Sequence, residues 1–144
     1  MTAPTQPSVL FVCVKNGGKS QMAAGLMRKA AGDTVTIDSA GTAPGATINE
    51  LSADVLLEVG VDITDQVPKQ LTDELISGFD RVIVLGREAQ VQPVDDTLVE
   101  YWDTDEPSER GIGGIERMRL VRDDITRRVD DLARQLGQGR VPTP

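Results

Sequence analysis

The sequence predicts a three-layer α/β fold, in which a central four-stranded parallel sheet carries helices on both faces. Short apolar segments typical of buried strands alternate along the chain with amphipathic helical segments. Because parallel strands need long crossover connections, this alternation favours a parallel sheet. The length of 144 residues suffices for one core, so we expect a single domain over residues 1–144 with flexible tails at 1–7 and 137–144.

Four short segments rich in β-forming residues are the expected strands. The first is a continuous apolar run, whereas the second alternates between apolar and polar residues. In chain order, the expected strands cover residues 8–12, 34–39, 79–85 and 97–102, and residues 40–45 form a loop after the second of them.

Helical periodicity accounts for the segments between and after these strands. The expected helices cover 20–31, 49–59, 72–76 and 115–136, with a polar loop at 103–114 before the last of them. Gly32 and Gly60 stop the first two helices. The last helix has the clearest apolar repeat, and we interpret its many charged residues as a solvated face.

The composition limits the classes of function. A net charge of −8 argues against nucleic-acid and anionic-membrane partners, because both require a basic surface. A single cysteine excludes an internal disulfide, and neither a signal-peptide pattern nor a membrane-length apolar run is present, so we expect a cytoplasmic protein. The chain has no histidine, so proton transfer falls to a carboxylate, Lys, Tyr or water, and we expect no metal site.

The single cysteine, Cys13, ends the first expected strand and opens a glycine-containing turn. The turn leads through Lys19 and Ser20 into the next helix, and its Asn-Gly-Gly segment at 16–18 tolerates left-handed backbone conformations. Such a loop turns several N–H groups inward beside a helix N-terminus, which stabilises a thiolate and an oxyanion together. We therefore interpret Cys13 as a catalytic nucleophile.

Two other interpretations use the same residues. A free cysteine at the end of a buried strand is commonly a small core residue. Gly18-Lys19-Ser20 also resembles the end of a nucleotide-binding loop, but that motif requires its first glycine at the position of Cys13. The unusual turn after the cysteine favours catalysis over both.

The spacing Cys13-x5-Lys19-Ser20 resembles Cys-x5-Arg-Ser, the signature of the low-molecular-weight tyrosine phosphatases and of the arsenate reductases that share their fold. Residues 19–24 (Lys-Ser-Gln-Met-Ala-Ala) resemble the Arg-Ser-Gln-Met-Ala-Glu stretch of the reductases. Residues 39–42 (Ser-Ala-Gly-Thr) and 102–107 (Trp-Asp-Thr-Asp-Glu-Pro) resemble two further family segments, the second being the acid loop. The resemblance covers about residues 8–136 and implies a flavodoxin-like topology.

The chain departs from the family pattern at three places. Lys19 replaces the loop arginine, so a compact ammonium stands where a guanidinium would form two parallel hydrogen bonds. The family's general acid directly precedes the proline of the acid loop, which is Glu106 here, but aspartate is usual and Asp105 is adjacent. We keep both candidates with a narrow preference for Asp105. Gly86 and Gln92 stand near the positions of two further cysteines of many relatives.

The resemblance implies a single-cysteine arsenate reductase of the arsenate–mycothiol transferase type. Cys13 would attack arsenate with the help of Lys19 and Ser20, and Asp105 or Glu106 would protonate the leaving group. The residues expected to bind the oxyanion are Val14, Lys15, Asn16, Gly17, Gly18, Lys19 and Ser20.

The electrons for arsenate reduction must come from outside, because one cysteine cannot close an internal disulfide. By resemblance, we expect mycothiol, or else glutathione, as a thiol co-substrate, and a mycoredoxin or glutaredoxin-like redoxin that releases arsenite. No tightly bound cofactor is expected. Two alternatives remain: a tyrosine phosphatase with a phosphocysteine intermediate, whose aromatic pair would be Tyr101 and Trp102, and a non-catalytic oxyanion-binding relative.

Overall fold

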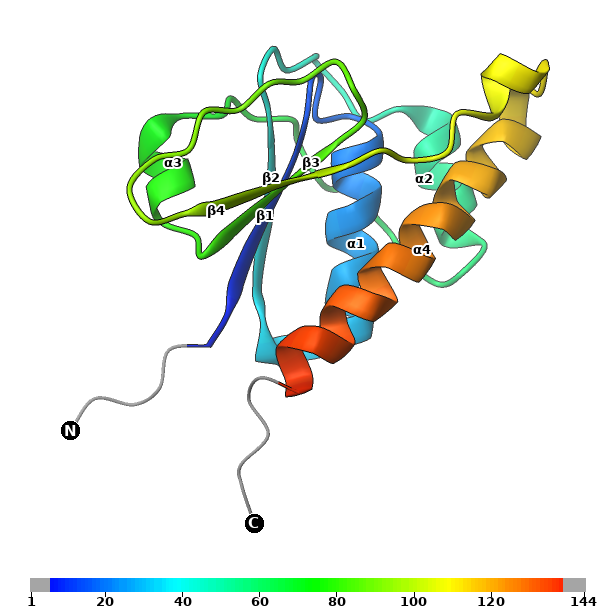
Figure 1. Ribbon diagram of the computed structural model, residues 1–144. Helices are drawn as coiled ribbons and strands as arrows, with labels where there is room; N and C mark the ends of the chain where they lie inside the picture. The colour runs from blue at the N-terminus through cyan, green and yellow to red at the C-terminus, as the bar shows by residue number, and fades with distance from the viewer. Residues whose placement is uncertain (1–5, 139–144) are drawn as a thin grey trace.

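The computed structural model describes residues 6–138, in which four parallel strands form one sheet (Figure 1). The strands are β1 (Ser8–Cys13), β2 (Thr36–Gly41), β3 (Arg81–Leu85) and β4 (Leu98–Trp102). Their order is β2-β1-β3-β4, and each neighbouring pair is parallel. The predicted sheet is confirmed, and its strand order is that of flavodoxin-like folds.

Helices cover both faces of this sheet, as predicted (Figure 1). The α-helices are α1 (Lys19–Ala31), α2 (Glu50–Leu57), α3 (Asp73–Ser77) and α4 (Gly114–Gln138), and the 3₁₀ helices are η1 (Gly32–Thr34) and η2 (Pro107–Arg110). Helices α1, α2 and α4 pack together on one face, and the short α3 lies on the other. No helix within residues 6–138 has the length and apolar character needed to cross a bilayer.

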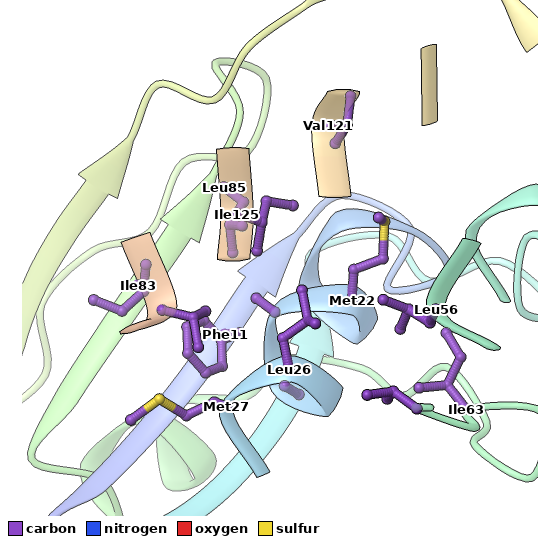
Figure 2. Packing of buried hydrophobic residues seen from close by; sticks show 14 of the residues in the cluster. Phe11, Met22, Leu26, Met27, Leu56, Ile63, Ile83, Leu85, Val121 and Ile125 are labelled. Carbon is purple, nitrogen blue, oxygen red and sulfur yellow. The ribbon is translucent and has the colours of Figure 1, made fainter. Parts of the chain in front are cut away.

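Strand β1 lies inside the sheet and contributes to two apolar clusters. Its successive side chains point to opposite faces, so Phe11 packs among residues of α1 and α4, whereas Leu10 and Val12 face the side of α3. Figure 2 shows Phe11 close to Met27 of α1, with Ile125 of α4 in the same cluster. Burial of a side chain such as Phe11 contributes about 1.5–3 kcal/mol to folding.

Two helix starts are fixed by polar side chains. The Asn49 side chain accepts the Ser52 N–H at 2.9 Å and caps α2, and the Thr72 hydroxyl accepts the Leu75 N–H at 3.1 Å and caps α3. Caps of this kind typically contribute about 1 kcal/mol. The helices expected from 49 and 72 therefore begin one residue later, with these two residues as their N-caps.

Strand β2 differs from its expected bounds. It begins at Thr36, because the preceding residues form η1, and it runs to Gly41 through part of the expected loop at 40–45. The extension follows from pairing with β1, whose last residue, Cys13, lies opposite Gly41. Local sequence could not show this register, which depends on the partner strand.

Helix α4 is longer than expected and ends at Gln138, so the tail predicted from residue 137 is wrong for its first two residues. The fully buried side chains of Val121, Ile125 and Val129 confirm the predicted apolar repeat. The remaining parts of the predicted tails at 1–5 and 139–144 lie outside the described residues.

An ion-pair cluster joins the end of α2 to α4. The Glu58 carboxylate accepts hydrogen bonds from the guanidinium groups of Arg119 and Arg122, each at 2.7 Å at its shortest. Hydrogen bonds from Arg119 first, and then from Arg122, lower the pKa of the Glu58 carboxyl from 4.5 to about 2. The ionised carboxylate therefore stabilises the folded protein.

We expect Glu58→Gln to weaken the acid dependence of stability. A carboxyl whose pKa is lower in the folded state contributes stability above its unfolded pKa of 4.5, and this contribution is lost as the pH falls towards about 2. Urea unfolding across this window should show a shallower loss for the variant than for the wild type. Glu74→Gln, which removes an exposed carboxylate of α3, is the control, and equal slopes for Glu58→Gln and wild type would contradict the assignment.

Gly41 lies where β2 meets the loop after Cys13. A Cβ atom at this position would lie 2.5 Å from the Val14 carbonyl oxygen and 2.9 Å from the Asn16 Cβ. The first of these neighbours is backbone, which cannot move aside without moving the loop. Glycine is therefore required for the close approach of β2 to the loop.

We expect Gly41→Ala to lower the free energy of unfolding by about 1–3 kcal/mol, the usual cost of overpacking. Urea denaturation compared with Gly113→Ala gives the measurement, because a Cβ at Gly113 meets no atom within 4 Å. Equal midpoints for the two variants would show that the loop tolerates displacement.

Candidate active site

The loop after Cys13 lies at the carboxyl edge of the sheet, where ligands bind in doubly wound α/β folds. Cys13 is the last residue of β1, and residues 14–18 connect it to α1. The acid loop follows β4, which runs parallel to β1 through β3. The two predicted halves of the site therefore meet at one edge of the sheet.

The segment 42–49 fixes the orientation of this loop. Backbone N–H groups of the segment donate to loop carbonyls: Thr42 to Cys13 at 3.1 Å, Ala43 to Val14 at 2.8 Å, Gly45 to Lys15 at 3.0 Å and Asn49 to Gly17 at 2.7 Å. In a trans peptide unit the carbonyl and the N–H point in opposite directions. Because these carbonyls turn outward, the N–H groups that follow them in the loop turn away from the segment and form an anion-binding concavity.

The Cys13 sulfur receives hydrogen bonds from this loop. The Asn16 N–H donates to Sγ at 3.3 Å, and the Ser20 Oγ lies 3.0 Å from Sγ. The Asn16 Nδ2 donates to the same Ser20 Oγ at 2.8 Å, so the Ser20 hydroxyl is set to donate towards the sulfur. These contacts fix the position of the sulfur against the loop and the first turn of α1.

Asn16 is fully buried and holds the loop in shape. Its φ of 53° lies in the left-handed region, in which asparagine is one of the few tolerated residues. Its Oδ1 accepts the Lys69 backbone N–H at 3.0 Å, which fixes the orientation of the amide, and Gln21 donates to its backbone carbonyl at 3.1 Å. Asn16 thus connects the sulfur, α1 and a distant chain segment.

A pocket of about 790 Å³ opens beside the loop, and Cys13 lines it. Of the residues expected to bind the oxyanion, those that line the pocket are Val14, Lys15, Gly17, Gly18 and Lys19. Asn16 and Ser20 are instead buried behind the loop. The N-cap of α1 is Gly18, and no side chain caps this helix, so its first N–H groups are open to an anion.

Glu106 lies in the pocket between two cations. Its Oε1 forms an ion pair with the Lys19 Nζ, and its Oε2 accepts a hydrogen bond from the Arg117 Nη2 at 3.2 Å. Lys19 begins α1, whereas Arg117 lies in the first turns of α4. The carboxylate therefore bridges groups from two helices.

The pKa of Glu106 reflects two opposed effects. Partial burial raises the pKa of this carboxyl, and hydrogen bonds from Lys19 and Arg117 together outweigh the burial, so that the pKa lies below its ordinary value of 4.5. With Lys19 and Arg117 in these positions, Glu106 is therefore ionised near neutral pH.

Asp105 faces away from the pocket. Its carboxylate binds the Arg110 guanidinium through two hydrogen bonds of 2.8 and 3.1 Å, and it does not line the pocket. The hydrogen bond from Arg110 lowers the pKa of Asp105. This placement favours Glu106 over Asp105 as the acid, against the narrow preference drawn from the sequence.

Helix α4 anchors the acid loop. The Asp124 Oδ2 accepts the Asp105 N–H at 2.9 Å, and the Arg128 Nη2 donates to the Asp103 carbonyl at 2.8 Å. The interpretation of the α4 charges as a solvated face is therefore wrong for this part of the helix. Its polar residues position the segment that carries Glu106.

The two aromatic residues at the start of the acid loop, Tyr101 and Trp102, do not line the pocket. Tyr101 is exposed and its hydroxyl bonds to the backbone of Val91, whereas Trp102 packs against Phe11 with ring centroids 5.9 Å apart. No described residue that lines the pocket is aromatic. The aromatic pair that would hold a phenyl ring in a tyrosine phosphatase is thus not formed by these side chains.

The two positions near the missing cysteines have different surroundings. Gly86 lines the pocket with a φ of 89°, and a Cβ atom there would lie 3.7 Å from the Lys19 Nζ. Gln92 is exposed and does not line the pocket. One of the two positions is therefore part of the site.

Arg117 and Asp124 were missed by reasoning from the sequence. Both lie in a helix whose apolar repeat identifies only its buried face. The one signal for Arg117 is its place near the start of α4, where the helix dipole disfavours a cation. Asp124 carries no such signal, because its role depends on the distant acid loop.

Comparison with known proteins agrees with this geometry. The profile of the family described as low molecular weight phosphotyrosine protein phosphatase matches residues 8–141. An arsenate reductase of Halalkalibacterium halodurans is 33% identical over 132 residues, covering 87% of this chain and 94% of its own, and an arsenate reductase of Bacillus subtilis is 32% identical over 133 residues with the same coverage.

A solved structure extends the similarity to three dimensions. The thioredoxin-dependent arsenate reductase of Corynebacterium glutamicum superimposes with a TM-score of 0.80 at 32% identity, and the match covers 96% of this chain and 66% of that one. The four strands, the loop after Cys13 and the acid loop of this chain lie within the residues that the family profile matches. The chain therefore belongs to the low-molecular-weight phosphotyrosine protein phosphatase family.

Proposed function

We propose that this protein is an arsenate reductase that uses Cys13 as its nucleophile and an external thiol as its reductant. The observation that carries the proposal is the Cys13 sulfur at the wall of the pocket, hydrogen-bonded by the Asn16 N–H and by Ser20. The relatives named arsenate reductases support the choice of arsenate, and the lack of an aromatic side chain among the described lining residues speaks against an aryl phosphate.

The first step forms a bond between sulfur and arsenic. Arsenate binds to the inward N–H groups of the loop, the N-terminus of α1 and Lys19, which together offset its negative charge. The Cys13 thiolate attacks arsenic, and one As–O bond breaks. The departing hydroxyl takes a proton and leaves as water, so the adduct remains As(V).

Glu106 is the proton donor for this step. Arsenate competes with Glu106 for Lys19, and when Lys19 turns to the oxyanion the carboxyl loses a hydrogen bond and gains an anionic neighbour. Both changes raise the pKa of Glu106 and favour its protonated form. Because the chain has no histidine, a carboxylic acid next to the pocket is the group best suited to this task.

The second step transfers two electrons from sulfur to arsenic. In one route the thiolate of an external thiol attacks the Cys13 sulfur, a disulfide forms, the S–As bond breaks, and its electron pair reduces As(V) to arsenite. In the other, the thiol takes over the arsenic, and a redoxin releases arsenite from that adduct. In the first route a redoxin reduces the mixed disulfide between Cys13 and the thiol. In the second the mixed disulfide joins the thiol to the redoxin, and a second molecule of the thiol reduces it. We propose mycothiol with a mycoredoxin, in preference to glutathione with a glutaredoxin-like protein.

We expect NADPH oxidation when the protein is supplied with arsenate, mycothiol, mycoredoxin and the NADPH-dependent reductase of the pair. Cys13→Ser should abolish it, because a hydroxyl replaces the sulfur that bonds arsenic. Parallel arms with glutathione and glutaredoxin, and with thioredoxin and its reductase, identify the donor.

The same assay separates the alternatives. Turnover equal in wild type and Cys13→Ser would overturn the proposal, and turnover with thioredoxin alone would overturn the choice of an external thiol. Hydrolysis of an aryl phosphate faster than arsenate reduction would identify a phosphatase instead.

We expect Glu106→Gln to lower arsenate turnover about 100-fold or more at saturating arsenate, the usual range for loss of a general acid. Asp105→Asn should lower it by less than about tenfold, because Asp105 binds Arg110 outside the pocket. Steady-state rates near neutral pH compare the two. A larger loss for Asp105→Asn would reassign the proton donor.

A further inference from the structure

The pocket wall includes an arginine of α4, Arg117, that no sequence motif identifies. A lysine at the start of α1 offers an oxyanion one compact charge, whereas a guanidinium offers two parallel N–H groups. Arg117 of α4 lines the same pocket as Cys13 and Lys19. It therefore belongs to the wall of the pocket in which the oxyanion of the proposed function would bind.

The hydrogen bonds of Arg117 are incomplete. Its Nη2 donates to Glu106 at 3.2 Å, but its Nε is buried and has no hydrogen-bond partner among the described residues. The Nε and Nη2 groups form one edge of the guanidinium, the edge that binds carboxylates and tetrahedral oxyanions through two parallel bonds. One half of this edge is therefore unused.

A second unpartnered group belongs to the same pocket. Thr104 is 2% exposed and lines the pocket, and its hydroxyl oxygen has no partner among the described residues. Within those residues, the buried side-chain polar atoms without a partner are Gln21 Oε1, Thr104 Oγ1 and Arg117 Nε. Since buried polar groups are nearly always hydrogen-bonded, two such groups at one pocket indicate a polar ligand.

Glu106 marks the position of that ligand. Its two carboxylate oxygens are divided between Lys19 and Arg117, as two oxygens of a bound oxyanion would be. The internal carboxylate thus pairs the same two cations that a bound oxyanion would pair.

We propose that Arg117 binds the oxyanion substrate directly through its Nε–Nη2 edge and supplies the guanidinium that the loop lacks. The oxyanion replaces the Glu106 carboxylate between Lys19 and Arg117, and Glu106 moves aside to act on the leaving group. This inference rests on the oxyanion site of the proposed function, but not on arsenate reduction itself.

The test measures anion binding rather than turnover. Iodoacetamide alkylates the Cys13 thiolate, and arsenate or inorganic phosphate bound in the loop should protect it. The readout is the anion concentration that gives half protection. We expect Arg117→Met, which keeps an apolar stem, to raise this concentration at least about tenfold, and Arg117→Lys to raise it less.

Matched variants separate binding from a structural role. Arg134→Met removes an exposed arginine at the far end of α4 and should leave the half-protecting concentration within about twofold of wild type. The double variant Lys19→Arg/Arg117→Met should recover most of the lost affinity, because the loop regains a guanidinium. Absence of recovery would overturn the claim that Arg117 stands in for the loop arginine.

A double-mutant cycle with Glu106 decides whether Arg117 acts through that carboxylate. If Arg117 binds the oxyanion itself, Arg117→Met weakens protection in the Glu106→Gln background as well. If it only positions Glu106, the second substitution has no further effect, and the proposal fails. Circular dichroism confirms that each variant is folded.

The outcome is independent of the reductase assay. Protection that depends on Arg117 in a protein without arsenate turnover would uphold this inference and overturn the proposed function. Arsenate turnover by the wild type, together with unchanged protection in Arg117→Met, would uphold the proposed function and overturn this inference. A wild-type Cys13 that neither anion protects would overturn both.

Discussion

The site depends above all on the direction in which a few peptide units point. A protein with a net charge of −8 must gather positive potential locally if it is to hold an oxyanion, and the loop after Cys13 offers backbone dipoles for this. The segment 42–49 holds the carbonyls of these units on its own side. Both ends of that segment are themselves fixed, by strand pairing at Gly41 and by the Asn49 cap of α2. The fold therefore sets the electrostatics of the loop.

Charged side chains from three separate elements add to the backbone dipoles of the loop. Lys19 comes from the start of α1, Glu106 from the acid loop and Arg117 from α4. The carboxylate between them offsets part of the repulsion between the two cations and leaves this group of three side chains with a net positive charge. In the binding mode proposed above, an oxyanion would replace a charge of the same sign, so the two cations would stay paired with an anion throughout.

The sequence was sufficient for the parts of the structure that local pattern encodes. Alternation of elements predicted the parallel sheet, and the turn after Cys13 singled out the nucleophile loop. The sequence was insufficient where contacts between distant segments determine the bounds of an element or the surroundings of a side chain. The extension of β2 to Gly41 depends on its partner strand, and the choice between Asp105 and Glu106 depends on which arginine reaches which carboxylate. A helical repeat identifies the buried face of α4 but not the segments that contact its polar face. The sequence therefore did not indicate that Arg117 lines the pocket.

The backbone at Gly86 limits which side chains this part of the pocket wall can carry. Its backbone φ of 89° is strained for any residue that carries a side chain. A Cβ atom there would lie 3.7 Å from the Lys19 Nζ, at ordinary van der Waals distance, so the pocket itself has room for a small side chain. A thiol introduced at this position would therefore be opposed by the backbone conformation and not by the lysine.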